Sequence, residues 1–146
     1  MTQLTEHFAL EELTFSSTAT RLGIDNSPSL EIVACLTQCA MGLEKIRALL
    51  GQPMHIDSGY RCPDLNKAVG GAADSAHMQG YAADFICPAF GTPLEIVHAI
   101  QAAGIPLDQC IQEGTWVHVS FAPAMRNEYL TAHFADSGAT YTEGVA

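Results

Sequence analysis

The stretch QCIQEGTWVHVSF occupies residues 109–121 and consists of two alternating runs joined by Gly114-Thr115. A two-residue connection that begins with glycine is typical of a type II′ β-hairpin, so we expect antiparallel strands over 109–113 and 116–121. Alternation assigns the second strand's side chains to two faces, with Trp116, His118 and Ser120 on one and Val117, Val119 and Phe121 on the other. The valine face must be the core face, which leaves His118 on the polar face.

Helical periodicity dominates two segments that precede this hairpin. Apolar residues recur every three or four positions up to Gly51, which predicts a long core helix that starts at Ser27-Pro28 and stops at that glycine. Thr92-Pro93-Leu94-Glu95 is a capping box that predicts a second helix, closed by Gly104. The shorter segments are predicted as a strand over 54–57, a brief helix over 63–69, a loop over 72–80 and a strand over 81–86.

This order of helices and strands predicts an α+β fold with a small, mainly antiparallel sheet and packed helices. The chain has 146 residues, 48% of them apolar, which suits a single domain; we place it at residues 1–135. Residues 1–26 are expected to wrap around the body as a short helical element and turns. Beyond Pro123 the periodicity fades, and residues 136–146 are expected to form a loose tail.

The charge balance narrows the range of partners. The chain has 16 acidic and 6 basic residues, a formal net charge of -10, and its basic residues are scattered. Nucleic acids and anionic membrane surfaces bind clustered Lys and Arg, so neither is expected as a partner. No apolar run approaches the roughly 20 residues of a membrane span. The N-terminus lacks the order of a signal peptide, so we expect synthesis in the cytoplasm. No protein partner can be inferred.

The stretch SAHMQGYAAD, residues 75–84, contains a candidate pair of metal ligands. Gly80 can provide a sharp turn that brings His77 back onto Asp84 in the following strand. The alternative for this pair is a simple hydrogen bond, and the alternative for His118 is a packing histidine. Two histidines and one carboxylate leave a fourth zinc position open, which is the pattern of catalytic zinc. Five cysteines without a CxxC spacing are expected to be free thiols.

The predicted hairpin also gives a position for Glu113. A two-residue loop pairs Ile111 with His118, so Glu113 shares the face of His118 as a diagonal neighbour about 7 Å away. That separation suits a carboxylate that takes a proton from a zinc-activated water, although a solvated turn glutamate is the alternative. Arg61 could hold a substrate carboxylate or a developing oxyanion, and its alternative is a structural salt bridge.

Together these motifs resemble the family of zinc D-Ala-D-Ala carboxypeptidases and related phage peptidoglycan endopeptidases. The resemblance covers roughly residues 8–123. The matching pieces are SGYR at 58–61, SAHMQGYAAD at 75–84 and WVHVS at 116–120, supported by FALEEL at 8–13 and NKAVGG at 66–71.

The resemblance implies the α+β fold shared with the Hedgehog signalling domain and zinc-dependent hydrolysis of peptidoglycan stem peptides, as a carboxypeptidase or an endopeptidase. It implies the following roles: His77, Asp84 and His118 as zinc ligands, Glu113 as the base, Arg61 as the electrophilic aid. The residues expected to contact substrate are Ser58, Tyr60, Ser75 and Trp116. Many members place the base three residues before the last zinc histidine, where this chain has Thr115, so Asp108 stays open as an alternative base.

Two other hypotheses remain besides the enzyme. The chain could be a catalytically inactive, zinc-stabilised binding or structural module of the same fold, or a structural protein without metal. If it is an enzyme, a catalytic domain without a leader would suit a phage endolysin released by a holin, a virion component, or a bacterial or prophage-encoded cytoplasmic protein.

Overall fold

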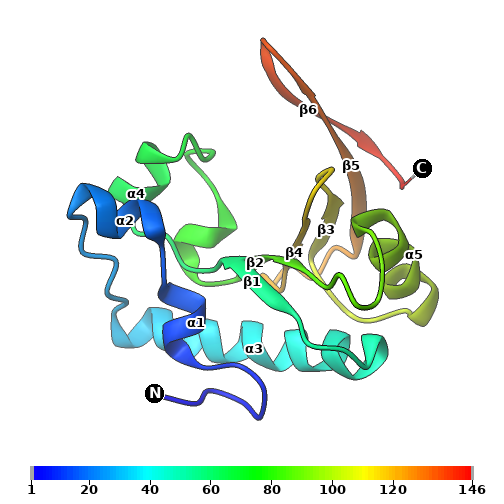
Figure 1. Cartoon of the computed structure of the whole chain (residues 1–146), viewed down its shortest axis with the longest axis horizontal. Helices are drawn as coiled ribbons and strands as arrows, with labels where there is room; N and C mark the ends of the chain where they lie inside the picture. Colours follow the sequence, from blue (N-terminus) through cyan, green and yellow to red (C-terminus); the bar gives the residue numbers. More distant parts are fainter. Residues whose placement is uncertain (1, 146) are drawn as a thin grey trace.

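The computed structural model describes residues 2–145. Within this range the elements are α1 (Leu10–Thr14), α2 (Ser17–Leu22), α3 (Leu30–Leu50), β1 (His55–Ser58), α4 (Pro63–Ala68), the 3-10 turn η1 (Ala76–Gln79), β2 (Ala82–Ile86), α5 (Pro93–Ala103), β3 (Gln109–Gln112), β4 (Val117–Ser120), β5 (Glu128–Ala135) and β6 (Gly138–Glu143). Five α-helices pack with one mixed six-stranded sheet of order β1-β2-β4-β3-β5-β6, which confirms the α+β prediction (Figure 1).

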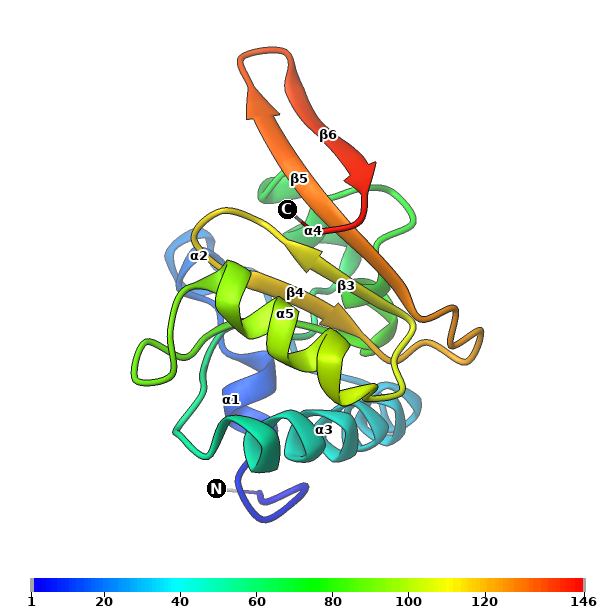
Figure 2. The same ribbon diagram turned by 90° about the vertical axis from the view of Figure 1, so that its right-hand side faces the viewer.

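The apolar core lies between the sheet and its two longest helices. Helices α3 and α5 contact each other beneath the sheet (Figures 1 and 2). Fully buried side chains on the strands include Phe85, Val117 and Val119. Because strand side chains alternate between faces, the residues between these core positions project from the opposite face, where the candidate site lies. Within residues 2–145, no helix is both long and apolar enough to cross a membrane.

The sheet register aligns residues from five strands in one row. Asp84 of β2 pairs with His118 of β4, which pairs with Ile111 of β3. Ile111 pairs in turn with Leu130 of β5, which pairs with Glu143 of β6. Only the β3–β5 pair is parallel among these described strands, so the sheet is mainly antiparallel, as predicted.

The predicted hairpin register is confirmed. Gln112 pairs with Val117, and the Glu113 amide donates to the Trp116 carbonyl at 3.0 Å, so Gly114-Thr115 forms the two-residue loop. Gly114 has φ 79°, a left-handed value that glycine adopts without a steric penalty. The capping box at Thr92 and the end of α3 at Gly51 also form as predicted.

Helix α3 starts later than predicted. Ser29, not Ser27, is the N-cap, and its hydroxyl accepts a hydrogen bond from the Ile32 amide at 3.2 Å. The Ser27 amide instead donates to the Asp25 carboxylate at 3.0 Å. This local turn holds Ser27 outside the helix, so the next serine takes the capping position.

The N-terminal segment wraps against the loop after β1, and Asn26 makes the connection. Its side-chain amide donates to the carbonyls of Thr14 and Tyr60, both at 2.9 Å. Its side-chain oxygen accepts from the Cys62 amide at 2.7 Å. One partly buried amide group thereby links the first helices to the segment that carries Arg61.

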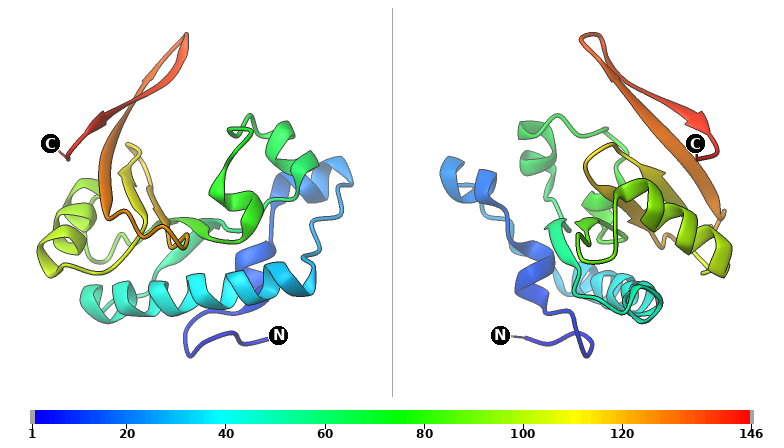
Figure 3. Two further views of the ribbon diagram at one scale, coloured as in Figure 1. Left: turned by 180° about the vertical axis from the view of Figure 1, so that it is seen from behind. Right: turned by 45° about the vertical axis from the view of Figure 1, so that its right-hand side comes forward.

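The C-terminal region differs from the expectation of a loose tail at 136–146. Residues 138–143 form β6, which pairs with β5 along the whole of its length, and the β5–β6 hairpin extends beyond the body of the molecule (Figures 2 and 3). All six residues of β6 are exposed, so an apolar alternation that would reveal this strand is missing. Strand β5 joins the sheet through a parallel, non-local pairing that sequence periodicity does not report.

The revised start of α3 can be tested with two serine variants. Ser29→Ala should lower the free energy of unfolding by about 1 kcal/mol because the Ile32 amide loses its acceptor. Ser27→Ala should change it by less than about 0.5 kcal/mol. Urea unfolding followed by circular dichroism measures both free energies. A larger loss of stability for Ser27→Ala than for Ser29→Ala would show that Ser27 is the N-cap.

Candidate metal centre

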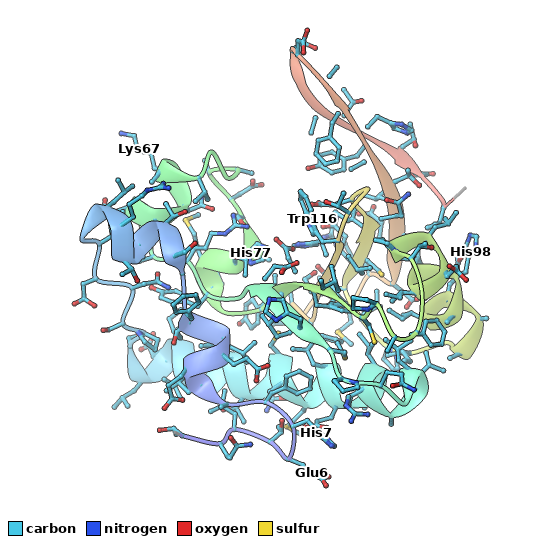
Figure 4. The ribbon with its side chains drawn as sticks, viewed as in Figure 1. Glu6, His7, Lys67, His77, His98 and Trp116 are labelled. Atoms are coloured by element: carbon cyan, nitrogen blue, oxygen red, sulfur yellow. The ribbon has the colours of Figure 1, made fainter. Side chains whose placement is uncertain are left out.

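Three side chains from separate elements converge on the polar face of the sheet. The β2–β4 pairing sets Asp84 directly opposite His118. His77 lies in η1, which ends at Gly80 with φ 80°, and the chain then enters β2. The glycine turn therefore brings the loop histidine back to the strand carboxylate, as predicted. In Figure 4, His77 and Trp116 lie on either side of the space above the sheet.

The potential ligand atoms of these residues are close together. Asp84 Oδ1 lies 2.9 Å from His118 Nδ1 and 3.2 Å from His77 Nε2. The three ligand atoms all lie within 4.8 Å of one another. In a tetrahedral zinc site, bonds of about 2.0–2.1 Å separate neighbouring ligand atoms by about 3.3 Å. The triad thus needs only small adjustments to hold a metal ion of this size.

The hydrogen bonding of His77 favours its role as a ligand. Its Nδ1 lies 2.7 Å from the Gly59 carbonyl oxygen, which can only accept, so Nδ1 carries the proton. Burial is the largest influence on the imidazole and lowers its pKa, which favours the neutral form. Nε2 then directs a lone pair toward the Asp84 carboxylate. Two electron-rich atoms facing each other in a buried site fit a cation between them.

Asp84 is the negative centre of the site. Burial alone would raise its pKa, but the neighbouring imidazoles of His77 and His118, with a hydrogen bond between His118 Nδ1 and the carboxylate, lower it well below the usual range. Arg61 Nη2 lies 3.4 Å from the other carboxylate oxygen, Oδ2. Asp84 is therefore ionised at neutral pH, as a metal ligand must be.

A set of polar side chains holds Arg61 in place. Its Nε donates to Ser58 Oγ at 3.1 Å, and its Nη1 donates to Asn66 Oδ1 at 3.2 Å. Asn66 is itself buried and donates to the Ala72 carbonyl at 2.9 Å. The guanidinium is thus oriented before any ligand arrives, with its side chain 15% exposed toward the cleft.

The triad forms the floor of a cleft of about 470 Å³. One wall is the segment from Gly70 to Ala76, which consists mainly of small residues. Glu113 lines the cleft on the β3–β4 side, whereas Thr115 is exposed in the turn. Burial raises the pKa of Glu113, and the negative charge of Asp84 adds to this although His118 opposes it.

The residues expected to contact substrate are placed differently from one another. Ser75 lines the cleft, and its hydroxyl accepts from the His77 amide at 3.2 Å. Ser58 is instead engaged by Arg61, and Tyr60 is a buried core residue. Trp116 packs against Phe134 with ring centroids 6.0 Å apart. Ser58, Tyr60 and Trp116 are not among the residues that line the cleft.

Asp108, the alternative base, is engaged by Arg126. Its carboxylate accepts from the Arg126 Nε and Nη2 atoms, both at 3.0 Å, and from the Arg126 amide at 3.1 Å. The hydrogen bonds from Arg126 lower the pKa of Asp108. A carboxylate held in this way is a weak base, so the geometry favours Glu113 over Asp108.

Sequence reasoning missed several residues that build the site. Asn66 belongs to the NKAVGG motif, which supports the family resemblance but predicts no contact with Arg61. Gly71 is required because a Cβ there would collide with Asn66 Oδ1 and lie 2.8 Å from Arg61 Nη1. Leu130 and Tyr141 line the cleft from β5 and β6. The exposed residues of the C-terminal hairpin carried no signal that could have placed these two.

Comparison with known proteins gives one family. The sequence model of the family described as Peptidase M15 matches residues 6–120. This range contains the His77, Asp84 and His118 triad together with Arg61 and Glu113, and it ends before β5 and β6. A search of curated proteins produced no match.

Metal content provides a direct test of the triad. We expect one zinc per chain in the purified protein, and His77→Ala and His118→Ala should each abolish stoichiometric binding by removing one of three ligands. His98→Ala is the matched control because His98 lies on α5, away from the triad (Figure 4). Elemental analysis after dialysis measures the metal. Equal zinc in the His98 and His118 variants would contradict the assignment.

Proposed function

The chain belongs to the peptidase M15 family, which is zinc D-Ala-D-Ala carboxypeptidase-like, and on that premise we propose that it hydrolyses a peptide bond in peptidoglycan stem peptides. The observation that carries this proposal is the convergence of His77, Asp84 and His118 at the floor of an open cleft. Three ligands leave one coordination position for chemistry, whereas a structural zinc site is closed by four.

The chemistry follows from the residues around the triad. A zinc ion bound there would supply an activated water and polarise the scissile carbonyl. Glu113 is proposed to accept the proton that the attack releases and to pass it to the leaving amine. Its raised pKa brings it closer to neutral pH, where an efficient general base must operate.

Arg61 is proposed to bind the substrate. Its guanidinium is held by Ser58 and Asn66 and reaches the cleft beside Asp84, so it can donate to a substrate carboxylate or to the oxygen that becomes negative. A donor fixed in advance loses little conformational entropy when the substrate binds.

The wall from Gly70 to Ala76 supports a slim substrate. Four of its six residues that line the cleft are glycine or alanine, and the other two are Asp74 and Ser75, so no bulky apolar side chain projects into the cleft on that side. Such a surface accommodates alanine-sized side chains, which is why the terminal part of a stem peptide fits the proposal. A carboxypeptidase and an endopeptidase are both compatible with this open shape.

A zinc-stabilised module without catalysis is the second candidate. The observation in its favour concerns Thr115. This residue occupies the position at which many members of the family carry the base, and it is exposed in the turn. Glu113 lines the cleft and can replace that group only if it reaches the water. The two candidates therefore differ in what removal of Glu113 does.

The decisive variant is Glu113→Gln, which keeps the size of the side chain and removes the base. We expect turnover to fall by about 10²- to 10⁴-fold because general-base catalysis is lost. Zinc content should be unchanged, since Glu113 is not one of the triad. Mass spectrometry of a defined stem pentapeptide ending in D-Ala-D-Ala measures cleavage, and cross-linked muropeptides distinguish the endopeptidase.

Glu6→Gln, at an exposed N-terminal position, serves as the matched control and should cleave at the normal rate. If the zinc-loaded, unmutated protein cleaves none of these substrates, the enzyme proposal is wrong. If Glu113→Gln cleaves as fast as the unmutated protein, the base lies elsewhere.

Gly71→Ala tests the support of Arg61 independently of the metal. The added Cβ would displace Asn66 and with it the guanidinium, so we expect kcat/KM to fall by about 10²-fold with zinc retained. Ala73→Ser, in the same loop but outside the cleft lining, should remain near normal. Steady-state kinetics on the pentapeptide decide this, and equal values for both variants would contradict the role of the close packing at Gly71.

A further inference from the structure

The β5–β6 hairpin reaches the candidate site although it lies outside the family match. Leu130 of β5 and Tyr141 of β6 both line the cleft, whereas the match ends at residue 120. The hairpin rises on one side of the space above the sheet, and the loop between α4 and η1 rises on the other (Figures 1 and 3). The cleft therefore has a second wall made by residues that lie outside the family match.

The sheet register explains how Tyr141 reaches the site. Leu130 belongs to the row of Asp84 and His118, and Ala132 lies two residues further along the same face of β5. Tyr141 pairs with Ala132, so its ring projects from the site face of the hairpin. Strand β3 runs parallel to β5 and pairs Ile111 with Leu130, so Glu113 lies level with Ala132. Tyr141, the partner of Ala132, is therefore on the Glu113 side of the cleft.

Several contacts hold this hairpin in position. Phe134 packs against Trp116 next to the β3–β4 turn. Thr131 Oγ1 donates to the Gly144 carbonyl, and the Gly144 amide donates to the Tyr129 carbonyl, both at 2.8 Å. The parallel pairing with β3 adds backbone hydrogen bonds. The tyrosine is thus presented by a structured strand.

The surroundings of Tyr141 are those of a side chain available to a ligand. The residue is 51% exposed and lines the same cleft as Glu113 and Asp84, so a large part of its side chain is free to contact a ligand. Partial burial raises the pKa of its hydroxyl, and the negative charges of Glu113 and Asp84 raise it further. The phenol therefore stays protonated and remains a hydrogen-bond donor near the reaction centre.

We propose that Tyr141 is a substrate-contacting residue that determines specificity, with its ring packed against the bound stem peptide on the side of the cleft opposite the Gly70–Ala76 segment. This inference rests on the proposed function for the identity of the ligand. An aromatic ring provides a large contact area with few rotatable bonds, so it binds a peptide at little entropic cost. The hairpin thereby sets the width of a cleft whose floor is formed by the matched domain.

Kinetics of the full-length, zinc-loaded protein give the first test. Tyr141→Ala should raise KM for the stem pentapeptide by about 10-fold and leave kcat within about two-fold, because a contact made equally in ground and transition states is lost. Thr140→Ala changes the neighbouring residue on the other face of β6 and should match the unmutated protein. Equal KM values for the two variants, or a fall in kcat alone, would overturn the proposal.

A binding measurement separates this inference from the proposed function. The chain contains four tyrosines, so ring-labelled tyrosine gives a simple NMR spectrum in which Tyr141→Ala identifies one signal. In the Glu113→Gln background, titration with the pentapeptide should shift the Tyr141 signal and leave that of the buried Tyr129 in place. An unshifted Tyr141 signal at saturation overturns the contact. Binding with a shifted signal but without cleavage by the unmutated protein supports the contact and refutes only the enzymatic proposal.

Discussion

The antiparallel pairing of β2 with β4 is the constraint on which the site depends. It places Asp84 opposite His118, and the same pairing buries Phe85 and Val117 on the other face. A slip of one residue in either strand would move the carboxylate or the imidazole into the core and bring apolar side chains to the cleft. The hydrophobic effect therefore sets the metal geometry indirectly, because the core specifies the register and the register specifies the ligands.

The burial of the Asp84 carboxylate is the main electrostatic cost of this arrangement. A buried carboxylate is costly unless hydrogen bonds and positive charge compensate it, and here His118 and Arg61 do so. The Gly59 carbonyl determines which His77 nitrogen carries the proton and hence which one faces Asp84. Ser58 and Asn66 hold Arg61 by hydrogen bonds, with its Nη2 3.4 Å from Asp84 Oδ2. The surroundings of the triad thus prepare it for a cation.

Local signals predicted much of this structure, and non-local pairing accounts for most of what they missed. The β3–β4 register and the cap of α5 depend on neighbours within a few residues, and both were predictable. The carboxylate at Asp84 was found through its link to His77, but its place opposite His118 comes from two strands more than thirty residues apart. The predicted start of α3 was wrong because Ser27 and Ser29 are both possible N-cap residues. The hydrogen bond from the Ser27 amide to Asp25 keeps Ser27 out of the helix. Strand β5 pairs in parallel with β3, and no periodicity in the sequence indicates which strand will be its neighbour.

The parts of the cleft differ in local stability, because one wall is the exposed β5–β6 hairpin and the floor belongs to the core strands. Strand β6 buries no side chain and is held chiefly by β5, so its opening exposes far less apolar surface than any disruption of the core. Local opening of the hairpin is therefore expected to cost less free energy than opening of the core strands that carry Asp84 and His118. The cleft thus combines a floor that is anchored between core strands with one wall of lower local stability.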